Sequence, residues 1–249
     1  GTVAFDPTDD SVYEGNETAV ISVSGVSGAD AAESGSQSVT ITITENDSSP
    51  TVTLATSATS IAENAGSSLT LTATSSIAAD EDITVSISTS GTGTEGTDYS
   101  TISDITISAG ATTGTASFTP TDDSIYEGNE TGIVAISTVS GGSATEDGTQ
   151  SVTITITENE SAPTVTLSTS ATSIAENAGS SLTLTATLSV ATTADVTVGI
   201  STSGTGTEGT DYSTISDITI SAGATTGTAS FTPTDDSVYE GNETGIVAI

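Results

Sequence analysis

Apolar residues alternate with threonine and serine along most of the chain. The alternation has a period of two residues and occurs in short runs separated by polar segments. A period of two places apolar side chains on one face of a β-strand and polar side chains on the other. Within residues 50–162 the pattern predicts strands at 52–54, 69–73, 83–87, 105–107, 116–118 and 152–156, and a more continuously apolar central strand at 133–136.

The segments between these runs are rich in Gly, Asp, Asn and Ser, which favour turns. They lie at 63–67, 90–98, 108–114, 120–129 and 141–149. No segment has helical periodicity, and the abundant Thr, Val and Ile prefer strands. About seven strands with regularly spaced turns predict an all-β fold, an antiparallel β-sandwich.

One segment occurs three times. FDPTDDSVYEGNET begins at Phe5, and close copies begin at Phe118 and Phe231, 113 residues apart. This period predicts three parts: the C-terminal part of a repeat at 1–49, a complete repeat at 50–162, and a repeat lacking its last strand at 163–249. We call them the first segment, the middle repeat and the third repeat. We expect a portion of a longer array whose domains stack end to end, because the connection between repeats is too short for a flexible tether.

The charge balance is one-sided: the chain has 33 acidic residues and no Lys, Arg or His. Side-chain salt bridges are therefore impossible. Nucleic acid and an anionic membrane surface are excluded as direct partners, since both are bound through clustered cations. The mean hydropathy of +0.06 and the regular spacing of apolar residues predict a folded chain rather than a disordered one. Cysteine is absent, so no disulfide stabilises the fold.

Carboxylates are concentrated in the turn at 120–129, which with its copies at 7–16 and 233–242 we call the acidic loop. Asp122, Asp123, Glu127 and Glu130 fall within one short stretch and repel one another without a cationic side chain nearby. Calcium, which takes six to eight oxygen ligands, would relieve the repulsion. The alternative is that the Asp pair caps a turn and Glu130 lies on a solvated strand edge. We interpret Asp98, beside a Tyr99 predicted to be buried, as structural.

Four motifs of the middle repeat resemble the Calx-beta domain family: S-I-A-E-N at 60–64, G-T-D-Y at 96–99, D-D-x-x-x-E-G-N-E-T at 122–131, and acidic residues after T-I-T-I-T. The resemblance implies tandem immunoglobulin-like (Calx-beta) antiparallel β-sandwiches with calcium bound in loops at one end. The family often has an aspartate where this chain has Ser90 and Ser203. Its terminal acidic triplet is Glu-Asn-Glu or Glu-Asn-Asp here.

Carried over by motif, the resemblance implies candidate Ca²⁺ ligands in all three parts of the chain. In the middle repeat they are Glu63, Asp122, Asp123, Glu127, Glu158 and Glu160. In the third repeat they are Glu176, Asp235, Asp236 and Glu240, and in the first segment Asp9, Asp10, Glu14, Glu45 and Asp47.

Catalysis is not predicted, because the chain has no His, Cys or Lys and its carboxylates lie in repeated turns without aromatic sugar platforms. The leading hypothesis is a structural stalk or filament segment of a bacterial extracellular or cell-surface adhesin, stiffened by calcium, with neighbouring repeats of the same chain as partners. The alternative is that the repeats themselves bind glycans, surfaces or identical filaments through outward residues such as Thr153, Thr155 and Thr157. A regulatory calcium sensor is the third hypothesis.

Overall fold

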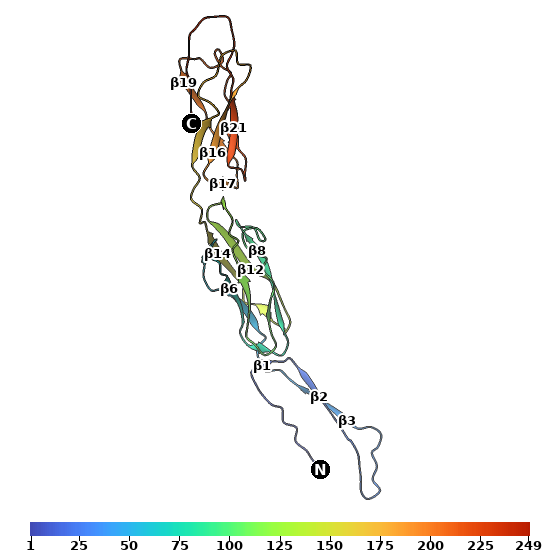
Figure 1. Ribbon diagram of the computed structural model, residues 1–249. Helices are drawn as coiled ribbons and strands as arrows, with labels where there is room; N and C mark the ends of the chain where they lie inside the picture. The colour runs from blue at the N-terminus through green and yellow to red at the C-terminus, as the bar shows by residue number, and fades with distance from the viewer. The chain divides into compact units, whose positions relative to one another are not determined.

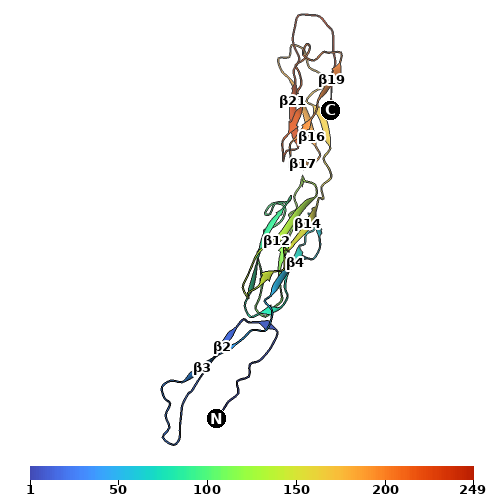
Figure 2. The ribbon, with the colours of Figure 1, turned by 180° about the vertical axis from the view of Figure 1, so that it is seen from behind.

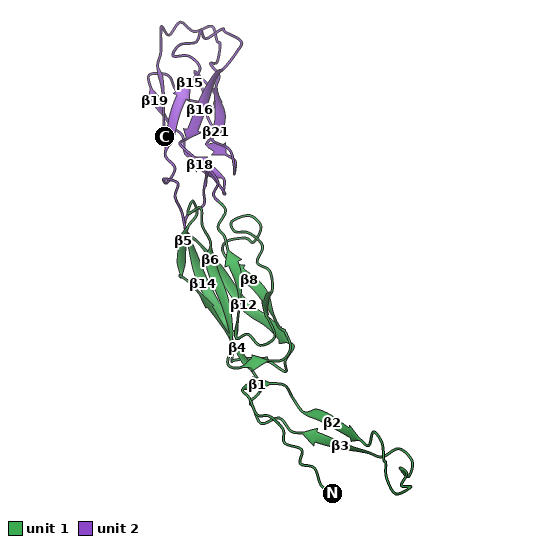
Figure 3. Cartoon of the chain, turned by 60° about the horizontal axis from the view of Figure 1, so that its bottom comes forward, with its two compact units in different colours: residues 1–121, 130–156 green, residues 122–129, 157–249 purple.

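The computed structural model describes residues 1–249 and consists of strands and loops alone (Figures 1 and 2). None of its segments is a helix that could cross a membrane. The chain forms two compact units (Figure 3). One comprises residues 1–121 and 130–156, and the other comprises residues 122–129 and 157–249. The predicted all-β class is confirmed.

The first unit contains a sandwich of two sheets. One sheet has the order β10-β6-β4-β13, and the other has the order β5-β14-β12-β8-β9. The strands of the first sheet are β4 (Thr51–Thr56), β6 (Leu69–Ser75), β10 (Thr113–Phe118) and β13 (Thr145–Glu146). Those of the second are β5 (Ser60–Ala62), β8 (Ile83–Gly91), β9 (Ile105–Ile107), β12 (Glu130–Ser140) and β14 (Ser151–Thr157).

The core of this sandwich comes from the alternating apolar positions of both sheets. Leu71 of one sheet and Val134 and Ile154 of the other are fully buried in a single cluster. The Tyr99 ring stacks on Phe118 with centroids 4.6 Å apart, which confirms that this tyrosine is buried. Gly132 lies against the Phe118 ring, and a Cβ atom at this position would come within 2.7 Å of that side chain. The aromatic pair therefore requires glycine at this position of β12.

The first segment lies outside that sandwich. Its β2 (Glu17–Ser22) and β3 (Ser38–Ile43) form an antiparallel pair with no second sheet packed on it (Figure 1). Its short β1 (Val12–Tyr13) pairs in parallel with β7 (Ala78–Ala79) of the middle repeat. The N–H of Asp80 donates to the Tyr13 carbonyl at 3.1 Å. The acidic loop thus supplies a strand to the edge of the repeat that follows it.

The second unit repeats this architecture less completely. A sheet of order β15-β16-β21 is accompanied by the pairs β18-β20, β19-β22 and β11-β17. The strands are β11 (Ile125–Tyr126), β15 (Val165–Thr169), β16 (Leu182–Leu188), β17 (Ala191–Thr192), β18 (Val196–Val198), β19 (Ser201–Gly204), β20 (Ile218–Ile220), β21 (Thr226–Phe231) and β22 (Gly245–Ala248). The pairing of β11 with β17 matches that of β1 with β7, 113 residues earlier. Within residues 1–249, β22 pairs only with β19.

Candidate metal site

The acidic loop is held closed by one carboxylate that follows β14. Glu158 Oε2 accepts the N–H groups of Glu127 at 2.6 Å and Gly128 at 2.8 Å, both from the acidic loop. Its Oε1 accepts the N–H groups of Asn159 at 2.9 Å and Glu160 at 3.0 Å. Four backbone N–H groups thus donate to this one carboxylate. Glu158 therefore serves first as a link between two loops.

The first segment repeats the arrangement. Glu45 Oε2 accepts the N–H groups of Glu14 and Gly15, each at 2.7 Å. Its Oε1 accepts those of Asn46 at 2.8 Å and Asp47 at 2.9 Å. The same link between the two loops therefore occurs in two copies of the repeat.

These hydrogen bonds keep both linking carboxylates ionised. Burial works to raise the pKa of Glu158, but the N–H groups of Glu160, Glu127 and Gly128 outweigh it and hold the pKa at about 2. For Glu45, the N–H groups of Asp47 and Glu14 lower the pKa from its usual value. Neither carboxylate needs a cation to remain charged.

The second aspartate of each Asp-Asp pair caps its own turn. Asp10 Oδ1 accepts the N–H of Val12 at 2.8 Å, and Asp123 Oδ1 accepts that of Ile125 at 2.7 Å. Asp236 Oδ1 accepts the N–H of Val238 at 2.6 Å. This geometry agrees with the turn-capping alternative for these three residues.

Three carboxylates converge in the third repeat, and Asp211 Oδ2 also accepts the N–H of Thr207 at 2.6 Å. One oxygen of each of Asp211, Glu240 and Glu243 lies within 4.8 Å of the others. Calcium holds its ligands at about 2.3–2.6 Å, so oxygens on opposite sides of one ion are about 4.6–5.2 Å apart, and oxygens within 4.8 Å of one another can share an ion. The matching residues 113 positions earlier, Asp98, Glu127 and Glu130, form a group by the same criterion.

The carboxylates in the third-repeat group raise one another's pKa values. Burial and the charges of Asp211 and Asp236 raise the pKa of Glu240. Burial and the charges of Asp211 and Glu240 raise that of Glu243. With no Lys, Arg or His in the chain, nothing offsets this negative charge. The donor set is that of a hard, oxygen-binding cation.

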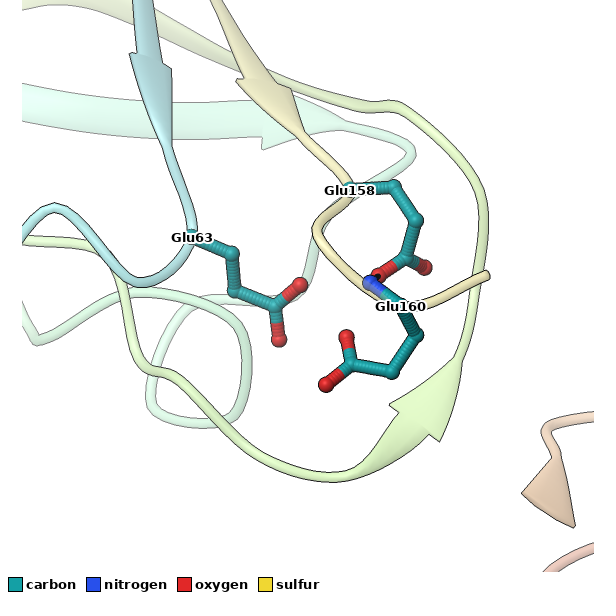
Figure 4. Close-up of side chains that lie close together, drawn as sticks. All are labelled: Glu63, Glu158 and Glu160. Carbon is teal, nitrogen blue, oxygen red and sulfur yellow. Dashed lines mark hydrogen bonds between the residues drawn. The ribbon is translucent and has the colours of Figure 1, made fainter. Parts of the chain in front are cut away.

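A further group contains Glu63, Glu158 and Glu160 (Figure 4), with one oxygen of each within 4.8 Å of the others. Glu63 is only 6% exposed. The neighbouring Glu158 carboxylate and burial raise the pKa of Glu160. Glu160 Oε2 is a buried atom without a hydrogen-bond partner. The oxygen is therefore available to a ligand.

The predicted ligands are distributed unevenly over these groups. Glu63, Glu127, Glu158, Glu160 and Glu240 each lie in a converging group. The five residues predicted in the first segment surround a cavity of about 40 Å³. They are Asp9, Asp10, Glu14, Glu45 and Asp47.

The other predicted ligands lie outside the converging groups. Asp123 and Asp236 cap turns, and Glu176 Oε1 accepts the N–H of Asp236 at 3.1 Å. Asp122 and Asp235 are exposed in their loops.

Four residues of the converging groups are not among the ligands predicted from the family resemblance: Asp98, Glu130, Asp211 and Glu243. Of these, Glu130 was named as a member of the acidic cluster in the sequence. Asp98 does have the expected structural role, since its Oδ2 accepts the N–H of Thr94 at 2.6 Å. Asp98 also lies close to two other carboxylates, Glu127 of the acidic loop and Glu130 at the start of β12. The signal was present in the sequence, because the G-T-D-Y motif and the Glu of N-E-T recur together in both repeats.

The Calx-beta domain family matches residues 45–160 and again residues 158–249. These two matches cover most of the sequence. The chain therefore belongs to the Calx-beta domain family and carries tandem Calx-beta domains.

Three solved structures are similar at low identity. The apo-form Calx CBD1 domain is 16% identical, with 44% of this chain and 99% of that chain covered and a TM-score of 0.38. The CBD12 structure from CALX1.2 is 18% identical, with 72% and 73% covered and a TM-score of 0.36. The calcium binding domain CBD12 of CALX1.1 is 16% identical, with 71% and 73% covered and a TM-score of 0.34. No curated protein matches the chain.

Proposed function

We propose that this chain is a segment of a structural stalk or filament of an extracellular, repetitive bacterial adhesin, stiffened by calcium bound in its acidic loops. The observation that carries the proposal is the convergence of Asp211, Glu240 and Glu243 in a chain without a single cationic side chain. The chain's membership of the Calx-beta family, whose domains typically bind calcium, supports the choice of ion.

The electrostatics of the group favour a bound cation. Burial and the neighbouring negative charges together raise the pKa values of Glu240 and Glu243. A divalent ion among the three carboxylates reverses this effect, because each oxygen then faces positive charge. Calcium accepts irregular sets of oxygen ligands more readily than magnesium, which demands near-ideal octahedral geometry. Extracellular modules bind calcium at roughly 10⁻⁴–10⁻³ M.

The acidic loop also joins one repeat to the next, which supports a role as a stalk. Glu127 directly follows β11, and β11 pairs with β17 of the third repeat. The same loop therefore carries a carboxylate of a converging group and the strand that binds the next repeat. An ion that orders this loop would strengthen the connection between repeats. Near-identical copies of constant length suit a spacer.

Calcium dependence of stability tests the proposal. The full chain should melt at a higher temperature in 5–10 mM calcium, on the order of ten times the Kd range above, than in excess EGTA at the same ionic strength. Asp211→Asn combined with Glu243→Gln should reduce the calcium-induced rise. Asp30→Asn, which removes a charge outside the groups, is the control. The same melting temperature in calcium and EGTA would exclude calcium stiffening.

A second candidate is that the repeats are themselves the adhesive surface. The outer face of the β4-β6-β10 sheet presents the row Thr53, Thr74 and Thr113, aligned across three strands and exposed. The second unit repeats the row with Thr166, Thr187 and Thr226. A flat array of hydroxyls suits hydrogen bonding to glycans. Under this alternative the full chain should bind immobilised glycans, and Thr74→Val with Thr187→Val should weaken that binding.

A further inference from the structure

The acidic loop of the middle repeat belongs structurally to the repeat that follows it. Residues 122–129 lie between β10 and β12 in the sequence, yet they are part of the compact unit that contains the third repeat. Within that unit β11 pairs in parallel with β17, with Ile125 opposite Ala191 and Tyr126 opposite Thr192. A loop that pairs with a strand outside its own repeat is an interaction surface.

The receiving strands β7 and β17 are two residues long and have small side chains, Ala-Ala in β7 and Ala-Thr in β17. Ala79 is only 1% exposed and Thr192 only 9%. The Ala79 carbonyl accepts the N–H of Gly110 at 2.7 Å, and the Thr192 carbonyl accepts that of Gly223 at 2.8 Å. Each receiving strand is therefore bound on one side by its own repeat, and its other side is available to an incoming strand.

The incoming strands have the complementary form. Each has one β-branched aliphatic residue and one tyrosine, Val12–Tyr13 in β1 and Ile125–Tyr126 in β11, and these residues are half-buried. Such residues favour extended pairing. At the first junction the N–H of Asp80 also donates to the Tyr13 carbonyl, whereas Thr193 takes the place of Asp80 at the second. The same register therefore forms at both junctions although the receiving sequences differ.

The loop is held in its pairing conformation by hydrogen bonds in which no cation takes part. Asp123 Oδ1 accepts the N–H of the first strand residue at 2.7 Å. Directly after the strand, the N–H groups of Glu127 and Gly128 donate to Glu158, whose own N–H donates to Asn129 Oδ1 at 3.0 Å. Gly128 has a φ of +77°, which favours glycine. The first segment has the same contacts, made by Asp10, Glu45 and Asn16.

We propose that the β7 or β17 edge is a receptor for the acidic loop of the preceding repeat, which docks there without a cation and folds together with the repeat that receives it. The ligand is an extended aliphatic–tyrosine dipeptide, between a turn-capping Asp and the Glu-Gly pair that binds the linking carboxylate. This is strand addition within one chain, in which the main chain provides the pairing and the small receptor residues accommodate large partners. The docking does not depend on the calcium stiffening proposed above.

Docking in this direction couples neighbouring repeats. The stability of a tandem array is approximately the sum of the stability of each repeat and of interface contributions between nearest neighbours. Here the loop of one repeat and the edge of the next form the interface, so unfolding of a repeat releases the loop that precedes it. The amides of the loop should therefore report on the following repeat, although their sequence lies in the preceding one.

Disulfide trapping in excess EGTA tests docking without a cation. The chain has no cysteine, so Ile125→Cys with Ala191→Cys introduces two thiols at opposite positions of the register. Paired strands are about 5 Å apart, which a disulfide can span. Ile125→Cys with Ser230→Cys, an exposed site on β21, is the control. Intramolecular crosslinking should be at least about tenfold faster in the first pair, because docking raises the effective thiol concentration. Equal rates in EGTA overturn the proposal, whatever calcium does to the melting temperature.

A backbone substitution weakens docking without changing the receptor. Added to the trapping pair, Gly128→Ala should slow crosslinking about fivefold or more, because alanine is disfavoured at a positive φ. Gly96→Ala is the matched control, since Gly96 has a φ of +86° and, like Gly128, open space around it. It should leave the crosslinking rate unchanged. Equal effects of the two substitutions overturn the role of the Glu-Gly pair in docking.

Hydrogen exchange in urea and EGTA tests which repeat the loop folds with. Ile218→Ala removes a buried side chain from the third repeat, and Ile105→Ala removes the matching one from the middle repeat. Ile218→Ala should lower the protection of the Tyr126 amide by the same factor as that of the Leu184 amide in β16. Ile105→Ala is the control and should lower the protection of Leu71 while leaving that of Leu184 unchanged. An unchanged Tyr126 amide in Ile218→Ala overturns the proposal.

Discussion

The middle and third repeats have nearly identical sequences but different surroundings. Residues 90–131 and 203–244 differ at one position, where Ile125 corresponds to Val238. Yet Phe118 is fully buried, whereas Phe231 is partly exposed. Burial of the phenylalanine ring here depends on a strand distant in sequence, because Ile154 and Ile156 of β14 join the cluster around Phe118, whereas residues 163–249 do not include the matching strand.

The acidic loop shows the same contrast on a smaller scale. Val12–Tyr13 and Ile125–Tyr126 are strands that pair with β7 and β17. In the third repeat Tyr239 is 97% exposed and belongs to no strand. Within residues 1–249 the loop thus forms this strand in the two copies that are followed by a β7 or β17 edge.

The largest effect on stability is expected when the phenylalanine ring is removed from each repeat in turn. Phe118→Ala should destabilise the middle repeat by about 3–5 kcal/mol, because it leaves a cavity in a closed core. Phe231→Ala should cost the third repeat only about 2 kcal/mol, because the ring is partly solvated already. Residue-resolved hydrogen exchange in urea measures each repeat separately. Equal costs would show that Phe231 is packed as closely as Phe118.

A smaller effect on stability is expected from the strand sequence that occurs in both the first segment and the middle repeat. Ile154→Ala should cost about 2–4 kcal/mol, since this side chain is fully buried. Ile41→Ala, within an identical ten-residue sequence, should change stability by less than about 0.5 kcal/mol in the monomer. Denaturation at low protein concentration measures both. A large cost for Ile41→Ala would place β3 in a core of its own.

The linking carboxylate should produce a moderate, pH-dependent effect. Glu158→Gln should cost about 1–2 kcal/mol at pH 7, after discounting for solvent exposure, by weakening four hydrogen bonds to a charged group. Because the folded-state pKa of about 2 is below the usual value of 4.5, the stabilisation is present above pH 4.5. It should be lost as the pH falls towards 2. Urea titrations from pH 7 to pH 2 should show the wild-type and variant stabilities converging.

The converging group should show the smallest effect, with the opposite sign. Glu243 has a raised pKa, so its contribution to stability is present below pH 4.5 and is lost as the pH rises through the raised value. In EGTA at pH 7, Glu243→Gln should therefore raise the melting temperature of the third repeat slightly. The gain should disappear at pH 4. A loss of stability at pH 7 would mean that the charge is already compensated.

Most of the fold was predictable from local pattern. The period-two alternation located the strands around Leu71, Ile105 and Ile154, because each face of a strand is set by neighbouring residues. The pairing of Val12–Tyr13 with Ala78–Ala79 was not predicted, because two-residue strands have no periodicity to detect.

The site was predictable only in part. Glu127 and Glu240 were selected and do converge with other carboxylates. Their partners Asp98 and Asp211 lie some thirty residues away in sequence, and only folding brings them near. Glu45 and Glu158 were predicted as ligands, and the structure shows in addition that each accepts backbone N–H groups of the acidic loop, which depends on where that loop folds.

By itself, the sequence determined the all-β class, the repeat of 113 residues and the absence of any cation to balance the acidic loops. These follow from composition and periodicity. The tertiary structure alone decided which carboxylates meet and which are held by the backbone. Those outcomes depend on non-local strand pairing, whose partners lie far apart along the chain.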